Sequence, residues 1–186
     1  MMCNEPAPLP LVAETIATPL GAVLLVTDRE DHVRAADFAD CENRLRRLLD
    51  RRLGRSGYEL ARGSVPKTIK TALEAYFSGD LSALGRIPLK TGGTAFQDAV
   101  WAALRSVEPG RPVTYAALAH RLGRAGSARA VGHANGANPI CIVIPCHRLI
   151  GADGALTGYS GGLARKRWLL DHEARYATRA SGSVGS

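Results

Sequence analysis

Five consecutive apolar residues, Ile140 to Ile144, are followed directly by a proline and a cysteine, Pro145 and Cys146. The run is rich in β-branched side chains, and a short run of this kind is typical of a strand that is buried on both faces of a sheet. Pro145 has no N–H group to extend a hydrogen-bonded ladder, so the strand should end there. We therefore expect the fold to contain a central sheet, with Cys146 at its rim.

Cys146 is followed by His147 and Arg148. A free cysteine has a pKa of about 8.5, and it becomes a good nucleophile only beside a base or in positive surroundings. His147 is a candidate base, and either residue could supply positive charge. The alternative is that Cys146 is a core residue, because cysteine is among the most often buried residue types. We interpret Cys141, inside the apolar run, in that second way.

A resemblance to a known family favours the catalytic interpretation of Cys146. The segments NPICIVIPCHRLIG, which starts at Asn138, and TGYSGGLARKRWLLDHE, which ends at Glu173, closely match a family pattern. They resemble the active-site region of the O6-alkylguanine-DNA alkyltransferases, also called methylated-DNA–protein-cysteine methyltransferases. The resemblance implies a ribonuclease-H-like α/β N-terminal domain, followed by a mainly α winged helix-turn-helix domain. It also implies DNA repair by alkyl transfer from O6-alkylguanine, with O4-methylthymine as a second substrate to consider.

An alkyl group on guanine O6 is inert to water, so its removal requires a soft nucleophile aligned for in-line displacement and a proton for the departing oxygen. The resemblance implies that Cys146 is this nucleophile, with His147 as the base and Glu173 orienting it in a Glu-His-water-Cys relay. Asn138 would brace the thiol through a hydrogen bond. Tyr115 would rotate the nucleotide and donate its phenolic proton toward the purine. From the residues alone, Glu173 would be interpreted as a surface acid.

A base inside a duplex is stacked, so the nucleotide must first be flipped out, at a cost of a few kcal/mol. The resemblance makes Arg129 the finger that fills the gap, on a recognition helix that starts near Ser127 and enters the minor groove. Arg124 and Ser127 would contact DNA beside it. The alternatives are an ordinary phosphate contact for Arg129 and an ordinary core position for Tyr115. The pocket for the alkylated guanine would be formed by Leu149, Tyr159 and Ser160.

The distribution of charge agrees with a DNA-binding second half. Residues 1–90 hold 13 Lys and Arg against 12 Asp and Glu, whereas residues 91–176 hold 10 against 5. The basic excess therefore lies on the same half as Cys146, which favours a nucleic-acid partner. We predict an N-terminal α/β domain without chemistry over 1–90, a DNA-binding alkyltransferase domain over 91–176 and a disordered tail over 177–186.

Local patterns in the first half predict a small α/β unit. Residues 1–14 are Pro-rich and should be loosely held, and residues 22–27 and 32–38 should pair as a hairpin. Apolar residues at helical spacing predict one helix over 45–53 and another over 69–77, after Ser64 and Pro66. The first is rich in arginine from Arg44 to Arg52 and could be a stripe that binds DNA. With acids on either side, we interpret it instead as a solvated face.

The second half begins with a helix signal and continues with a helix pair. Thr94 followed by Gln97 is a capping-box pattern, and it predicts a helix that extends to Val107. Thr114 should open a helix that ends at Leu122, and Ser127 should cap another that includes His133. Glycines lie in the turn between these two helices, as in a helix-turn-helix.

Cysteine usage and hydropathy exclude several other classes of protein. The four cysteines, at positions 3, 41, 141 and 146, include no CxxC pair, so neither a zinc site nor a disulfide framework is predicted. His32 does not complete a ligand set with Cys3 and Cys41. No hydrophobic stretch is long enough to span a membrane, and no signal peptide is present. We predict a cytoplasmic monomer without metal or cofactor.

Since a thioether does not readily revert to a thiol, the predicted enzyme acts once, and each molecule is consumed by one lesion. One alternative is a non-catalytic protein that binds alkylated DNA or regulates transcription through the same winged helix; related proteins of that kind lack the cysteine at position 146. A thiol hydrolase would also use cysteine and histidine, but it would leave the helix-turn-helix unexplained.

Overall fold

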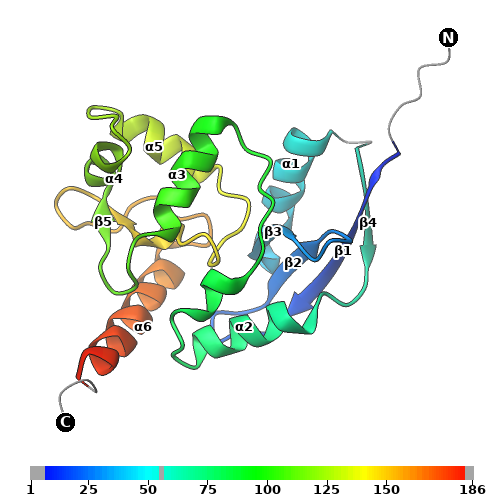
Figure 1. The fold of residues 1–186 in the computed structure, drawn as a ribbon, viewed down its shortest axis with the longest axis horizontal. Helices are drawn as coiled ribbons and strands as arrows, with labels where there is room; N and C mark the ends of the chain where they lie inside the picture. Colours follow the sequence, from blue (N-terminus) through cyan, green and yellow to red (C-terminus); the bar gives the residue numbers. More distant parts are fainter. Residues whose placement is uncertain (1–6, 55–56, 183–186) are drawn as a thin grey trace.

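The computed structural model of the chain describes residues 7–54 and 57–182. Its first half contains a four-stranded sheet with the strand order β3-β2-β1-β4, seen at the right of Figure 1. The pairs β1–β2 and β2–β3 are antiparallel, and β1–β4 is parallel. The predicted hairpin of β2 and β3 is confirmed. The strands are β1 (Leu9–Ile16), β2 (Val23–Thr27), β3 (Val33–Phe38) and β4 (Tyr58–Arg62).

Strand β1 corrects the prediction that residues 1–14 are loosely held, although residues 1–6 lie outside the described part. Leu11 and Ala13 are buried, with the two-residue spacing of a strand that packs on one face. Pro10 is tolerated because β1 pairs with β2 only from Val12 onward. The prolines concealed this signal, and β4 was not predicted at all.

Helix α1 (Glu42–Leu53) covers one face of the sheet and α2 (Lys67–Phe77) covers the other, so both predicted helices of the first half are confirmed. Neighbouring residues of β2 point to opposite faces. Leu24 belongs to the buried cluster on the side of α1, whereas Leu25 belongs to the cluster on the side of α2. That second cluster continues into the second half of the chain, so the two halves share one core.

The second half is mainly helical and lies at the left of Figure 1. The Thr94–Gln97 capping box is confirmed in full, and the Thr114 side chain accepts a hydrogen bond from the Ala117 N–H. Ser127 precedes a helix as predicted, but its side chain makes no capping hydrogen bond. The elements are α3 (Ala95–Arg105), β5 (Val113–Thr114), α4 (Tyr115–Arg121), α5 (Ala128–Gly136), the 3-10 helix η3 (Cys146–Arg148), β6 (Leu149–Ile150) and α6 (Leu163–Gly182).

The prediction of a strand over Ile140–Ile144 is wrong. The segment is fully buried, but only Ile140 bridges to the sheet, at Ala36 of β3, and the chain then turns. The Ile144 N–H donates to the Ile140 carbonyl, and Ile142 has a φ of 72°. A β-branched residue adopts this conformation only where its surroundings fix it. A short apolar run shows that a segment is buried, but it does not distinguish a strand from a compact turn.

Helix α6 corrects the predicted disordered tail. It continues past Ala177 to Gly182, because neither glycine nor proline interrupts the sequence before that point. Thr178, on this extension, donates from its hydroxyl to the Ala174 carbonyl. Residues 183–186 lie outside the described part. Within that part, no helix is both long and apolar enough to cross a bilayer.

Candidate functional site

Cys146 is the first residue of η3, directly after the buried turn, and 3% of its surface is exposed. Its N–H donates to the Ile144 carbonyl over 2.7 Å. Asn138 holds this turn from inside: its Nδ2 donates to the Ile144 carbonyl over 3.0 Å, and its Oδ1 accepts from the Ile140 N–H over 2.9 Å. The side chain predicted to brace the thiol therefore also fixes the backbone that carries it.

The surroundings of Cys146 favour its thiolate. A hydrogen bond from the Cys141 thiol lowers the pKa of Cys146, whereas burial raises it. A hydrogen bond with Asn138 and the positive charge of Arg44 lower the pKa further, and the negative charge of Asp37 partly opposes Arg44. The same hydrogen bond between the thiols raises the pKa of Cys141 well above its ordinary value, and burial raises it more. Cys141 is thus a core residue, as predicted, but it also lowers the pKa of the Cys146 thiol.

The imidazole of His147 is placed to accept a proton. Its Nε2 lies 2.9 Å from Oε1 of Glu173, and both residues are completely buried. Glu173 is ionised, so it only accepts hydrogen bonds, and His147 must therefore carry a proton on Nε2. In the neutral ring, Nδ1 is then the basic nitrogen. This atom is buried and has no hydrogen-bond partner among the described residues, so it is free to act on a neighbouring group.

Glu173, on α6, is the acceptor for several buried donors from different parts of the chain. Arg148 donates to both of its oxygens, from Nε over 2.9 Å and from Nη2 over 2.8 Å. The Tyr76 hydroxyl of α2 donates over 2.8 Å, and the Gly110 N–H over 3.4 Å. Although burial alone would raise the pKa of Glu173, its charged and hydrogen-bonded partners hold that pKa far below its ordinary value. The carboxylate is therefore a fixed negative charge.

Arg44 brings the first half of the chain to the site, which sequence analysis did not anticipate. From α1, its Nη1 donates to Asp37 over 2.6 Å and lies 4.0 Å from the Cys141 sulfur. Its Nη2 donates to the carbonyls of Gly136, over 2.8 Å, and Asn138, over 3.0 Å, at the end of α5. No local pattern could identify this role, because its partners on α5 lie more than 90 residues further along the chain.

Lys166 is a second residue that sequence analysis did not single out. It is completely buried on α6, burial lowers its pKa, and its ammonium donates to the carbonyls of Leu149 and Thr157. The loop that contains Tyr159 and Ser160 is thereby fixed against β6. Leu149 is a predicted pocket residue, and its carbonyl accepts this hydrogen bond from Lys166. Leu149 therefore also holds β6 to α6.

Tyr159 and Ser160 reach the site from the loop before α6. The Tyr159 ring meets the His147 ring edge to face, with 6.5 Å between centroids, and its hydroxyl has no hydrogen-bond partner among the described residues. The Ser160 hydroxyl lies 3.5 Å from the Cys141 sulfur. The structure therefore brings Tyr159 to His147 and Ser160 to the Cys141 thiol.

The predicted DNA-binding residues lie on the surface formed by α4 and α5. The Tyr115 ring packs close to Gly132 of α5, and its hydroxyl lies near Gly158. Arg129 is exposed, and together with Tyr115 it lines a groove of about 800 Å³ between α5 and α1. Arg124 is exposed and Ser127 half-buried, and neither lines this groove. Cys146 does not line it either.

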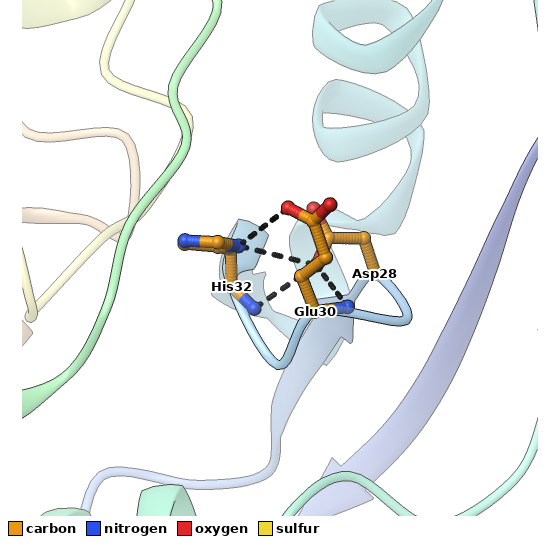
Figure 2. Close-up of side chains that lie close together, drawn as sticks. All are labelled: Asp28, Glu30 and His32. Carbon is orange, nitrogen blue, oxygen red and sulfur yellow. Dashed lines mark hydrogen bonds and ion pairs between the residues drawn. The ribbon is translucent and has the colours of Figure 1, made fainter.

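The turn between β2 and β3 holds another group of polar side chains, Asp28, Glu30 and His32 (Figure 2). One oxygen of Asp28 accepts from the N–H groups of Glu30 and His32, each over 3.0 Å, and the other pairs with Arg34 at 3.3 Å. These contacts are those of an Asp that stabilises a tight turn. These contacts explain why Asp28, Glu30 and His32 lie close together, and no bound ion is needed to explain it. We therefore propose no metal site here.

Comparisons with known proteins agree in both halves of the chain. Residues 11–91 match the family model described as "6-O-methylguanine DNA methyltransferase, ribonuclease-like domain", and residues 95–175 match the "DNA binding domain" of the same family. A methylated-DNA–protein-cysteine methyltransferase of Shigella flexneri is 47% identical over 165 residues, which cover 89% of this chain and 96% of that protein. One from Salmonella typhimurium has the same identity and coverage.

Solved structures give the same result. The chain is similar to Mycobacterium tuberculosis OGT in complex with DNA, with a TM-score of 0.73 and 35% identity over 90% of this chain and 94% of that one. It is also similar to an O6-methylguanine-DNA methyltransferase from Pyrococcus kodakaraensis, with a TM-score of 0.65 and 28% identity over 88% of this chain and 98% of that one.

The buried Glu173 carboxylate generates a prediction about stability. Replacing Glu173 by Gln leaves Arg148 without its charged partner, and loss of one member of a buried pair costs about 3–5 kcal/mol. Because the folded-state pKa of Glu173 is depressed, its contribution is present above the unfolded value near pH 4.3 and is lost as the pH falls toward the folded value. Urea unfolding between about pH 7 and pH 3 should therefore show a weaker pH dependence in Glu173→Gln.

The matched control for this experiment is Glu74→Gln, which removes an exposed carboxylate on α2. Its free energy of unfolding should stay within about 0.5 kcal/mol of the unsubstituted protein. Equal effects of the two substitutions would contradict the central role given to Glu173.

The hydrogen bond between the two thiols generates a second prediction. In Cys141→Ala the pKa of Cys146 should rise, because the donor that favours its thiolate is removed. Alkylation of Cys146 by iodoacetamide near pH 7 should be roughly two- to tenfold slower, the worth of one hydrogen bond. Near about pH 10 the rates should converge, since the thiol is then ionised in both proteins.

Cys141→Ser keeps a donor at this position and should restore most of the rate. Peptide mass spectrometry over a range of pH values distinguishes modification of Cys146 from that of the other cysteines. A uniform loss of rate at every pH would mean that Cys141 acts only on packing.

Proposed function

The chain belongs to the methylated-DNA–protein-cysteine methyltransferase family, and on that basis we propose that it repairs DNA by moving the alkyl group of O6-alkylguanine onto the thiol of Cys146. The proposal rests on one arrangement in the site: a buried cysteine whose pKa is lowered, next to a histidine that keeps Nδ1 free while Glu173 engages Nε2. O4-methylthymine would undergo the same displacement.

His147 takes the proton of the Cys146 thiol through a water molecule, and Glu173 stabilises the resulting imidazolium. The Cys146 sulfur then attacks the alkyl carbon from the side opposite O6. A sulfur–carbon bond forms, the carbon–oxygen bond breaks, and its electron pair leaves with the guanine. Tyr115 donates its phenolic proton toward the purine, so that neutral guanine is released. The thioether on Cys146 is stable, and each protein molecule therefore reacts once.

DNA is held by α4 and α5, which act as a helix-turn-helix with α5 in the minor groove, and the β5–β6 pair with the loop after it forms the wing. The damaged nucleotide is flipped out of the duplex, because in-line displacement cannot be reached inside the stack. Arg129 fills the gap that it leaves, and Tyr115 turns the nucleotide. Arg124 and Ser127 contact the DNA beside them. The base enters a pocket formed by Leu149, Tyr159 and Ser160.

We assign residues 1–90 to a ribonuclease-H-like domain and residues 91–176 to the alkyltransferase domain. The protein works as a monomer, without metal or cofactor. Since its substrate is DNA and its acceptor is a free thiol, we propose the cytoplasm as the compartment in which it acts.

The experiment that tests this function is mass spectrometry after incubation with a duplex that contains O6-methylguanine. We expect each protein molecule to gain one methyl group, about 14 Da in mass, because a thioether is not turned over. Peptide analysis should find this group on Cys146, and Cys146→Ala should gain none. Methylation of Cys141 instead, or more than one lesion repaired per molecule, would overturn the mechanism.

The role of Arg129 can be separated from that of the reaction site. In Arg129→Ala, repair of the duplex should become at least about tenfold slower, because filling the gap offsets part of the cost of flipping. The reaction with free O6-benzylguanine requires no flipping and should keep its rate. Arg124→Ala is the comparison. Removal of a side chain that contacts the DNA backbone should weaken the affinity for the duplex, but it should change the rate of alkyl transfer at saturating duplex much less. Equal decreases in rate for Arg129→Ala on both substrates would assign Arg129 to the fold.

A further inference from the structure

A groove of about 800 Å³ runs between α1 and α5. On the α1 side it is lined by Arg44, Arg47 and Arg51, which lie three and four residues apart and so share one face of that helix. On the α5 side it is lined by Arg129 and Gly132. Both halves of the chain therefore line this groove: the predicted recognition helix on one side, and on the other a helix from the half for which no chemistry was predicted.

Most of the positive charge in this groove is unpaired. Arg47, Arg51 and Arg129 are exposed, and none makes a hydrogen bond or ion pair with a described residue. No carboxylate is among the residues that line the groove. Arg44 differs, because Asp37 neutralises it. Several like charges in one concave surface focus a positive potential there, and a polyanion is the partner that satisfies it.

Resting on the function proposed above, we infer that this groove binds the sugar–phosphate backbone of the DNA beside the lesion, with Arg47 and Arg51 contacting phosphates. When α5 lies in the minor groove of a DNA duplex, one sugar–phosphate backbone of the DNA runs along each side of α5. The side of α5 that carries Gly136 faces α1, and the space beside Gly136 is open, whereas the Tyr115 ring lies beside Gly132. A strand can therefore approach α5 closely at Gly136 while the guanidinium groups of Arg47 and Arg51 reach its phosphates from the opposite wall.

This inference gives the arginine-rich helix a different role from the solvated face expected from its sequence. Acidic neighbours were the reason for that expectation, and Arg46 does follow it, because it pairs with Glu42 at 2.7 Å. Arg47 and Arg51 point to another side of the helix, into the groove. The first half of the protein thus contributes directly to DNA binding, and it does so separately from the helix-turn-helix.

The test compares two double variants of the full chain that have the same net charge. Arg47→Gln with Arg51→Gln removes the two free arginines of the groove, whereas Arg46→Gln with Arg62→Gln removes two arginines that pair with Glu42. Binding to a duplex is measured by fluorescence anisotropy over a range of salt concentrations. In the groove variant the slope of log K against log salt should become shallower by about 1.8, or roughly 0.9 for each phosphate that is no longer neutralised.

At physiological salt the groove variant should bind roughly tenfold more weakly, and the control should match the unsubstituted protein. Lysine at positions 47 and 51 should restore the slope, because it keeps the charge. All variants should react equally with free O6-benzylguanine, since the groove does not contain Cys146. Equal slopes for the groove variant and the control would overturn the inference.

The same samples separate the failure of this inference from failure of the proposed function. Duplex binding that depends on Arg47 and Arg51, without methyl transfer to Cys146, would overturn the repair function and leave the groove assigned to DNA. Methyl transfer with a salt slope that is unchanged by the groove substitutions would overturn only the inference. No duplex binding by the unsubstituted protein would overturn both.

Discussion

The other parts of the site depend on the hydrogen bonds and ion pairs that the buried carboxylate of Glu173 accepts. An ionised group cannot remain inside a protein unless donors replace the water that it has lost. Here the donors come from α2, through Tyr76, from η3, through His147 and Arg148, and from the loop before β5, through Gly110. One charge therefore holds both halves of the chain to α6. It also fixes the protonated nitrogen of His147, so that stability and the proposed chemistry rely on the same group.

Local signals in the sequence were sufficient for much of the fold. The hairpin, helices α1 and α2 and the Thr94–Gln97 capping box are fixed by residues close together in the chain, and each was predicted. The errors have a different origin. The turn over Ile140–Ile144 depends on the side-chain amide of Asn138, which donates to the Ile144 carbonyl. The spacing of apolar residues in the sequence does not reveal such a hydrogen bond. Likewise, the prolines near the N-terminus argued against a strand at β1. Pro10 is tolerated there because β2 pairs with β1 only from Val12 onward, and a local pattern does not contain the position of that partner strand.

The candidate site shows the same division. Cys146 and His147 are adjacent, and their resemblance to a family motif was enough to single them out, along with Glu173. The contribution of Arg44 was not predicted, because it acts across the interface between the two halves. Lys166 was not predicted either, since a lysine in a helix is normally solvated. Cys141 was recognised as a buried residue, but its effect on the Cys146 thiol depends on a turn that was expected to be a strand.

The arginines of α1 have a consequence for how this protein can be divided. Arg44 and Arg52 donate to the last carbonyls of α5, at Gly136 and Ala137, where a helix carries partial negative charge. These hydrogen bonds act as an external cap that fixes the direction of α5. The second half is therefore not a portable module. If α5 were grafted onto another scaffold, or the first half were exchanged for a different one, α5 would keep its sequence and lose its orientation unless α1 were transplanted with it.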